Sequence, residues 1–316
     1  MENSKNEILK KLIKRVPKGY LIPAVNNRAS YMHLIQTYSP IKVLDIGTGS
    51  VGIYLAILAL YYPHIKRFGI ESNLDSYNNA LKCLTELNMD VQLQCCNEIP
   101  LEWINTIDFV ICNPPFYSSK EAIVDSKNLK LESTSTFNFN GKDFEMIYNG
   151  GEVEFIKPFI HALLNSKSLK WFSVQFGFKS SITKLIQHLK FIQSLFGLHL
   201  RVKTHKIAFK TVRYVVVFQF ILKKPFKCQQ KLTESQFNSL ILELNNIGSI
   251  DSEGNTTTCL ISLNSWSRQF KRSPMVLTSK FQSYFTIERQ EYDFLIQGDG
   301  LSKSFYQYFK HKYKIT

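Results

Sequence analysis

Between residues 41 and 112, short apolar runs alternate with helical segments, and this alternation constrains the fold more than any other feature of the chain. The apolar runs have the length of buried strands and are predicted at residues 41–46, 67–71, 91–95 and 107–112. Helices are predicted between the first three runs, at residues 51–61 and 74–87. Strands and helices that alternate with short turns form a parallel, doubly wound α/β sheet.

Regular structure is interrupted after residue 117. Residues 118–149 are rich in Ser, Asn, Lys and Thr with little periodicity, so we expect a long loop that acts as a mobile lid over a substrate. Regular patterns resume with predicted helices at residues 151–165 and 180–191 and predicted strands at residues 169–176, 198–205 and 212–222. The last two strands have no helix between them and must pair antiparallel, which predicts a seven-stranded sheet with a reversed last strand.

Further segments flank this sheet. Residues 1–20 contain a basic amphipathic helix at 7–15, and a helix over residues 27–38 follows, with Asn26 or Asn27 as its N-cap. Residues 223–230 break the pattern and are interpreted as a linker. Residues 232–316 predict a small α+β domain with helices at 233–244 and 302–313 and strands near 259–263, 275–278 and 284–289.

The positive charge of the chain is confined to one stretch. The formal net charge is +14, from 39 Lys and Arg against 25 Asp and Glu residues. No acidic residue lies between Glu154 and Glu234, and fifteen of the basic residues lie in that interval, so the rest of the chain is nearly neutral. A localised basic stretch indicates a polyanionic partner such as nucleic acid, although a solvated basic surface without a partner has the same composition.

Composition excludes several classes of protein. With 44% hydrophobic and 13% aromatic residues, the chain can bury a large core. The longest apolar run, residues 51–62, is shorter than the roughly 20 residues that span a bilayer, and the N-terminus lacks the apolar region of a secretory signal. The six cysteines form no C-x-x-C pair, so we expect reduced thiols, with neither a metal site nor disulfides, in a protein that stays inside the cell.

A glycine-rich turn, DIGTGSVG at residues 45–52, joins the first predicted strand to the next helix. Its glycines permit a tight turn and the close approach of a ligand, and the helix N-terminus favours polar or anionic groups. The pattern serves dinucleotides and S-adenosylmethionine alike, and a carboxylate such as Glu71, at the end of the second strand, binds ribose hydroxyls in both classes. The turn alone therefore does not distinguish a dinucleotide site from an S-adenosylmethionine site. It also does not exclude a turn that binds no ligand.

The fourth predicted strand ends in the sequence CNPPF at residues 112–116, and this motif discriminates between the two classes of ligand. Two prolines fix the backbone and hold Asn113 rigidly at the carboxyl edge of the sheet, where open α/β sheets bind ligands. The Asn113 side-chain oxygen and the Pro114 carbonyl could accept hydrogen bonds from an exocyclic amine such as that of adenine, while Phe116 stacks on the base. A rigid turn with Phe116 in the core is the structural alternative.

These residues resemble the class I S-adenosylmethionine-dependent methyltransferases with an Asn-Pro-Pro-Phe motif. Within that class the chain is similar to the U6 small nuclear RNA adenine-N6 methyltransferases, the methyltransferase-like protein 16 group and its fungal relatives, which are akin to bacterial enzymes that methylate large-subunit ribosomal RNA. The resemblance covers about residues 21–220 and is carried by LIP at 21–23, Arg28, YMH at 31–33, DIGTG at 45–49, CNPPF at 112–116, GGEVEF at 150–155, Trp171, Gly177, Lys179 and TVRY at 211–214.

The resemblance implies a class I methyltransferase (Rossmann-like) domain over residues 21–224 with S-adenosyl-L-methionine as cofactor. It implies a catalytic loop made of Asn113, Pro114, Pro115 and Phe116. It implies cofactor-binding roles for Arg28, Asp45, Gly47, Thr48, Gly49, Glu71, Asn97 and Asn113. It implies RNA-binding roles for Lys179, in a mobile lysine-bearing loop of the family, for Lys210, where the family has Arg, and for Arg213.

The expected function is therefore transfer of a methyl group to N6 of an adenine in structured RNA, with U6 small nuclear RNA as the substrate. The resemblance implies a monomeric nuclear protein, with the cytoplasm as a second location, that needs neither a metal nor a membrane. Relatives carry a longer basic N-terminal region, and residues 232–316 are a further candidate RNA-binding part. The alternatives are an RNA-binding or splicing-associated protein without turnover, and a methyltransferase acting on ribosomal RNA or on a protein amide.

Overall fold

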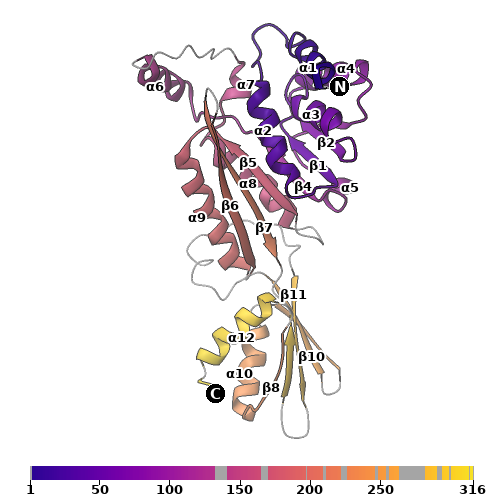
Figure 1. Cartoon of the computed structure of the whole chain (residues 1–316). Coiled ribbons are helices and arrows are strands. Elements are labelled where there is room, and N and C mark those ends of the chain that lie inside the picture. The colour runs from indigo at the N-terminus through magenta and orange to yellow at the C-terminus, as the bar shows by residue number, and fades with distance from the viewer. Residues whose placement is uncertain are drawn as a thin grey trace. The chain divides into compact units, whose positions relative to one another are not determined.

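A seven-stranded sheet with the strand order β3-β2-β1-β4-β5-β7-β6 dominates the fold in this computed structural model (Figure 1). Its strands are β1 Lys42–Ile46, β2 Lys66–Glu71, β3 Gln92–Cys95, β4 Phe109–Cys112, β5 Trp171–Phe176, β6 His199–Ala208 and β7 Val212–Ile221. Neighbours among β1 to β5 pair in parallel, whereas β7 runs antiparallel to β5, with Trp171 opposite Gln219 and Phe176 opposite Tyr214. The predicted parallel sheet with a reversed last strand is confirmed.

The described part of the chain divides into two compact units. The structure describes residues 2–131, 141–164, 170–196, 198–208, 211–221, 226–245, 248–253, 256–262, 282–289, 294–298, 300–312 and 314–315. One unit consists of Met1–Ile186 with Val202–Gln219, and the other of Gln187–Arg201 with Phe220–Thr316. In these ranges, no helix combines the length and the apolar character that a bilayer crossing requires.

Nine helices accompany the strands of the larger sheet among the described residues. They are α1 Glu2–Ile13, α2 Val25–Gln36, α3 Ile53–Tyr61, α4 Leu74–Glu86, α5 Leu101–Ile104, α6 Lys120–Leu131, α7 Asp143–Met146, α8 Glu152–Leu164 and α9 Lys179–Phe196. The helix α3 contacts α1, α2 and β2, and every residue from Ile53 to Leu58 is buried. A helix that is buried on nearly all sides has an apolar sequence on nearly all sides, as α3 does. This burial fixes the glycine turn that precedes α3 at the carboxyl edge of the sheet.

The N-terminal helix is part of the core. Leu9 and Leu12 of α1 are 2% and 0% exposed and belong to the same apolar cluster as α3. Lys10 and Lys11 lie on its exposed face. The amphipathic pattern thus predicted the helix, but only packing shows that it belongs to the larger unit.

The predicted N-cap of α2 is wrong. The helix begins at Val25, its N-cap is Ala24, and no side chain caps it. Asn27 lies inside the helix, is 4% exposed, and donates from Nδ2 to Thr211 Oγ1 at 3.0 Å. The side chain that would have capped the helix is used instead for a contact with the chain just before β7.

The long structureless loop expected over residues 118–149 is also wrong for the described residues. The helices α6 and α7 lie in it, and Tyr117 forms a parallel bridge with Ile147. Glu145 stabilises α7 because its Oε2 accepts hydrogen bonds from the backbone N–H groups of Lys142, at 2.9 Å, and of Leu21, at 2.8 Å. Residues 132–140 of the expected lid lie outside the described ranges.

The second unit contains a five-stranded antiparallel sheet with the order β8-β12-β11-β10-β9. Its elements are β8 Phe226–Gln230, α10 Glu234–Asn245, β9 Gly248–Glu253, β10 Thr256–Ser262, β11 Gln282–Arg289, β12 Phe294–Gly298 and α12 Gly300–Lys312. The helices α10 and α12 pack on this sheet through a buried apolar cluster that includes Leu240, Leu244, Phe305 and Phe309. This is the expected α+β architecture, but residues 226–230 form a strand where a linker was predicted, β9 and β12 were missed, and the predicted strand at 275–278 lies outside the described residues.

Four cysteines are free thiols among the described residues. Cys83 and Cys112 are buried, Cys96 is half-buried and Cys95 is exposed. Burial raises the pKa of the Cys112 thiol well above its usual value. No group of three or more His, Cys, Asp or Glu residues among those described is arranged to hold a metal ion.

Candidate active site

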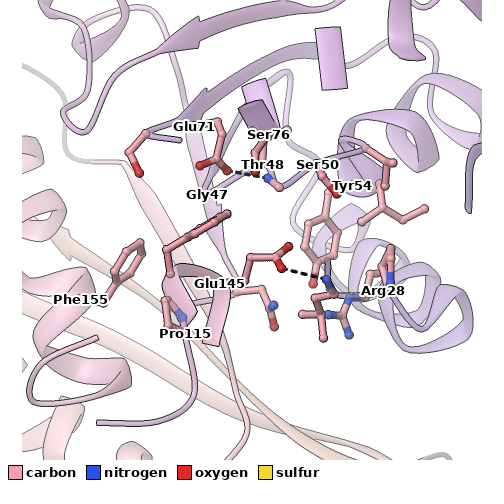
Figure 2. Close-up of a pocket in the computed structure, with 18 residues that line it drawn as sticks. Arg28, Gly47, Thr48, Ser50, Tyr54, Glu71, Ser76, Pro115, Glu145 and Phe155 are labelled. Carbon is pink, nitrogen blue, oxygen red and sulfur yellow. Dashed lines mark hydrogen bonds between the residues drawn. The ribbon is translucent and has the colours of Figure 1, made fainter. Parts of the chain in front are cut away.

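A cleft with about 800 Å³ of space, part of it open to solvent, lies at the carboxyl ends of β1, β2 and β4 (Figure 2). It is lined by Leu21, Pro23, Arg28, Gly47, Thr48, Gly49, Ser50, Val51, Ile53, Tyr54, Glu71, Ser72, Ser76, Asn113, Pro115, Phe144, Glu145 and Phe155. The carboxyl ends of parallel strands meet at one edge of a sheet, so residues far apart in the sequence converge here.

The glycine turn between β1 and α3 forms one wall of the cleft. The N–H groups of Gly47 and Thr48 donate to the Ile70 carbonyl at 3.0 and 3.1 Å, which ties the turn to β2. Gly47 and Gly49 both have a φ of 72°, and a Cβ built on either would meet no described atom within 4 Å. The turn therefore leaves open space above its backbone for a ligand to approach closely.

Glu71, the last residue of β2, is held by the backbone. Its Oε2 accepts from Gly49 N at 2.8 Å and its Oε1 accepts from Asn73 N at 2.9 Å. The side chain is buried yet lines the cleft, and each carboxylate oxygen can accept a second hydrogen bond. The unused acceptors suit a pair of hydroxyl groups, as on a ribose.

Asp45 is a buried carboxyl group beside this turn. Its side chain is 0% exposed, and neither carboxyl oxygen has a hydrogen-bond partner within the described chain. Burial raises its pKa well above the usual value, and the charge of Glu71 adds to that effect while Arg28 opposes it. A buried carboxyl without a partner is costly, so a donor or a cation from a ligand would stabilise it.

Arg28 projects from α2 toward the cleft. It is 5% exposed, its guanidinium carbon lies 6.0 Å from the centroid of the Tyr54 ring, and its Nε has no hydrogen-bond partner in the described structure. Tyr54 is itself fixed, because its hydroxyl donates to Gln175 Oε1 at 2.9 Å. Figure 2 shows Arg28 and Glu71 toward opposite sides of the cleft, so a ligand between them meets a cation at one end and a carboxylate at the other.

The loop after β4 forms another wall. Pro114 and Pro115 are buried, and the Asn113 Oδ1 atom is buried without a hydrogen-bond partner among the residues described. Asn113 and Pro115 line the cleft. The arrangement leaves a rigidly held acceptor next to the glycine turn.

Phe116 follows this loop and carries a cation on its ring. The Arg213 guanidinium carbon lies 4.9 Å from the ring centroid. Burial lowers the pKa of Arg213, and the nearby charge of Arg28 lowers it further. Phe116 is half-buried and not in the core, so the alternative of a purely structural phenylalanine is not supported.

Three predicted site residues lie elsewhere. Asn97 is exposed after β3 and is not among the residues that line the cleft, and the last backbone hydrogen bond to β2 before it is from Cys96 N to the Glu71 carbonyl. Lys179 is exposed as the first residue of α9. Lys210 lies outside the described residues.

Several lining residues were missed from the sequence. Glu145 and Phe144 come from α7, a four-residue helix inside the segment expected to be a loop, and no periodicity could have revealed it. Burial raises the pKa of Glu145. Phe155 belongs to the GGEVEF segment, so that motif was the available signal.

Comparison with known proteins decides the family. A family model described as RNA methyltransferase matches residues 10–208. The chain belongs to this RNA methyltransferase family. The match contains the glycine turn, Glu71 and the CNPPF loop.

Individual relatives of the chain come from eukaryotes and bacteria. It is 28% identical over 228 residues to the U6 small nuclear RNA (adenine-(43)-N(6))-methyltransferase of Schizosaccharomyces pombe, covering 66% of this chain and 56% of that protein. It is 31% identical to the RNA N(6)-adenosine-methyltransferase mettl16 of Danio rerio, covering 55% of this chain and 40% of that protein. It is 27% identical to the ribosomal RNA large subunit methyltransferase F of Christiangramia forsetii, covering 57% and 71%. The match thus spans about half the length of the two eukaryotic relatives.

The fold is shared with a solved structure. The hMettl16 catalytic domain in complex with MAT2A 3′UTR hairpin 1 superimposes with a TM-score of 0.53 at 24% identity, covering 64% of this chain and 72% of that chain. The chain therefore has the class I methyltransferase fold that the resemblance implied.

Proposed function

We propose that the chain is an S-adenosylmethionine-dependent RNA adenine-N6 methyltransferase and that U6 small nuclear RNA is its substrate. The observation that carries this proposal is the unpartnered Asn113 Oδ1 atom: Asn113 lines the same cleft as the glycine turn, and Phe116, whose ring meets Arg213, follows it in the same loop. An acceptor at that point suits an exocyclic amine, and an aromatic ring beside it suits a base.

The cleft fits S-adenosylmethionine on its own geometry. The open space above Gly47 and Gly49 admits a ligand, Glu71 has acceptors for ribose hydroxyls, and Arg28 is a cation that lines the cleft with an unused hydrogen-bonding atom. The amino acid moiety of the cofactor carries the complementary carboxylate. When bound, S-adenosylmethionine supplies the methyl group as an electrophile.

The residues of the chain act by positioning. Asn113 Oδ1 accepts a hydrogen bond from the adenine amine, which keeps the nitrogen lone pair out of the ring and available for attack, and Phe116 stacks on the base. Methyl transfer would form the new N–C bond while the methyl–sulfur bond of the sulfonium breaks, leaving S-adenosylhomocysteine, and the amine nitrogen would release a proton to water. We assign no charged general base, because the group that accepts the hydrogen bond from the amine is the neutral side-chain amide of Asn113.

The RNA substrate is inferred from charge and from the relatives. The acid-free interval between Glu154 and Glu234 contains Lys179 and Arg213, and we assign RNA phosphates to them and to Lys210. The Schizosaccharomyces pombe relative is named for U6 small nuclear RNA, which supports that target and, with it, a nuclear protein. That the protein is monomeric stays a prediction. Ribosomal RNA is the second candidate, because a bacterial relative named for it is covered over 71% of its length.

Substitution of Asn113 by alanine tests the mechanism. We expect Asn113→Ala to lose methylation of a U6 RNA transcript by at least about 100-fold, because an acceptor used in the transition state is removed. Asn78→Ala, on the exposed face of α4, is the matched control and should retain the wild-type rate. Methylation by Asn113→Ala at the wild-type rate would contradict the mechanism.

Two measurements separate the alternatives. Calorimetry with S-adenosylmethionine tests for an RNA-binding protein without turnover, since a chain that binds RNA but not the cofactor would refute the enzyme proposal. Mass spectrometry of RNA from cells without the protein tests the target. Loss of one N6-methyladenosine from U6 supports the proposal, and loss from ribosomal RNA alone favours the second candidate.

A further inference from the structure

Glu152, the first residue of α8, is a buried carboxylate that the proposed reaction does not use. It is 2% exposed and does not line the cofactor cleft. Its Oε1 accepts from Gly177 N and its Oε2 accepts from Ser181 Oγ, both at 2.5 Å. The backbone of Phe178 also donates to it. These donors belong to the turn after β5 and the first turn of α9, so Glu152 ties this turn and the start of α9 to α8.

The turn that Glu152 holds lies against the catalytic loop. A Cβ built on Gly177 would lie 3.1 Å from Phe116 Cγ, which means that the Gly177 backbone packs directly on the Phe116 ring. The next ring pair repeats the contact, since Tyr117 and Phe178 meet edge to face at 5.7 Å. With the Arg213 guanidinium at 4.9 Å, the Phe116 ring is held by the turn and by a cation.

We propose that Glu152 is a positioning residue for the methyl transfer: by fixing the turn at Gly177, its carboxylate fixes Phe116 and, through the two prolines, the acceptor of Asn113. This inference rests on the proposed function. A base stacked on Phe116 can be aligned with Asn113 only if the ring does not move, and displacements of about 1 Å at a reacting centre cost on the order of 100-fold in rate.

Ionisation of Glu152 controls how firmly the turn is held. The ionised carboxylate accepts from all three donors, whereas a protonated one carries a hydrogen that must displace one of them. Burial raises the pKa of Glu152 to about 7, and its hydrogen bonds and the charge of Arg213 limit that rise. The groups that face it from other elements are Arg213 of β7 and Cys112 of β4, and Asp125 of α6 and Lys184 of α9 line the same cavity.

The test compares Glu152→Gln with Glu154→Gln, a matched change at a half-exposed position of the same helix. For wild type and Glu154→Gln, kcat for methylation of a U6 RNA hairpin should fall about 10-fold per pH unit below pH 7, where the carboxylate is protonated. Glu152→Gln should show no such fall near neutrality and a kcat at pH 8 lower by about 10- to 100-fold, with the RNA KM and the cofactor Kd changed less than about 2-fold.

A second variant separates positioning from folding. Ser181→Ala keeps the carboxylate but removes a donor that favours its ionised form, so the fall in kcat should move to higher pH. An unchanged kcat and pH profile in Glu152→Gln, or an unmoved profile in Ser181→Ala, would overturn the proposal. Failure of the wild-type protein to methylate RNA refutes the proposed function instead.

Hydrogen exchange at pH 8 tests the positioning contact independently of activity. Peptides containing Gly177 and Phe116 should exchange faster in Glu152→Gln than in Glu154→Gln. Equal exchange in both peptides would overturn the proposal.

Discussion

Three side chains that line the cleft have buried hydrogen-bonding atoms that no described residue satisfies, namely Arg28 Nε, Ser76 Oγ and Asn113 Oδ1. Both oxygens of Asp45, which is buried beside the glycine turn, are likewise unsatisfied. Such groups are unusual inside a protein because each loses its hydration without gaining a partner. They are retained together at one edge of one sheet, which is the arrangement expected when a ligand completes their bonding. These unsatisfied atoms are therefore the strongest indication of function that individual residues provide.

Arg28 gives the first prediction. Arg28→Ala should raise the Kd for S-adenosylmethionine by about 10- to 100-fold, because a hydrogen bond to a charged group contributes about 1.5–3 kcal/mol. Titration calorimetry measures the change. Arg15→Ala, which removes only a partly exposed ion pair with Glu86, is the control and should leave the Kd unaltered. Equal affinity in both variants would mean that Arg28 does not contact the cofactor.

The glycine turn gives the second. Gly49→Ala places a side chain at a φ of 72° and in the open space above the turn, so we expect a loss of about 1–2 kcal/mol of stability and a larger loss of cofactor affinity. Gly52→Ala should show the reverse balance, because its Cβ would lie 2.7 Å from Leu84 Cδ1, away from the ligand. Thermal unfolding and calorimetry on both variants check the contrast, which disappears if the turn binds nothing.

At the scale of elements, burial decides what periodicity cannot. The sequence predicted most helices and strands of the larger sheet to within a few residues, since apolar runs and 3.6-residue periods follow from which faces are buried. It missed α5 and α7, which have four residues each, and α6, whose sequence shows no clear apolar stripe. Glu145 was not predicted as a site residue for the same reason, because it lies in α7. A hydrogen bond from the backbone of Leu21 helps to hold Glu145 at the cleft.

The packing of α1 gives the third prediction. Leu12→Ala should lower the free energy of unfolding by about 2–5 kcal/mol, because the side chain is 0% exposed in the core cluster. Denaturant unfolding followed by circular dichroism measures the loss. Lys11→Ala, on the exposed face of the same helix, should change stability little. A similar stability for the two variants would show that α1 is an appendage.

At the scale of the whole molecule, charge and chemistry are separated along the chain. The cofactor turn, Glu71 and the CNPPF loop precede the acid-free interval, whereas Lys179, Lys210 and Arg213 lie within it. Most of the interval lies within the larger sheet and its helices, through β5, β6 and β7, and the end of the interval reaches β8 of the second sheet, so it is not a basic tail. The basic residues are therefore carried by the same fold that holds the cleft.

Salt dependence gives the fourth prediction. The affinity for a U6 RNA hairpin should fall steeply with KCl, and Lys179→Ala should reduce the slope of log K against log [KCl] by about 1 for one lost phosphate contact. Fluorescence anisotropy measures the slope. Lys82→Ala, exposed on α4 outside the interval, is the control, and cofactor affinity should stay the same in both. A slope that falls equally in the two variants would argue against a local RNA surface.

The sequence by itself determined the sheet, its reversed strand, the glycine turn and the CNPPF loop, because these depend on local periodicity and on residues whose backbone preferences act over a few positions. Only the tertiary structure decided that Arg28 and Asn113 share one cleft with unsatisfied atoms, that Arg213 lies on Phe116, and that Glu152 holds the turn against that ring. Those relations join residues between 25 and almost 100 positions apart, and they follow from packing, for which a linear pattern carries no signal.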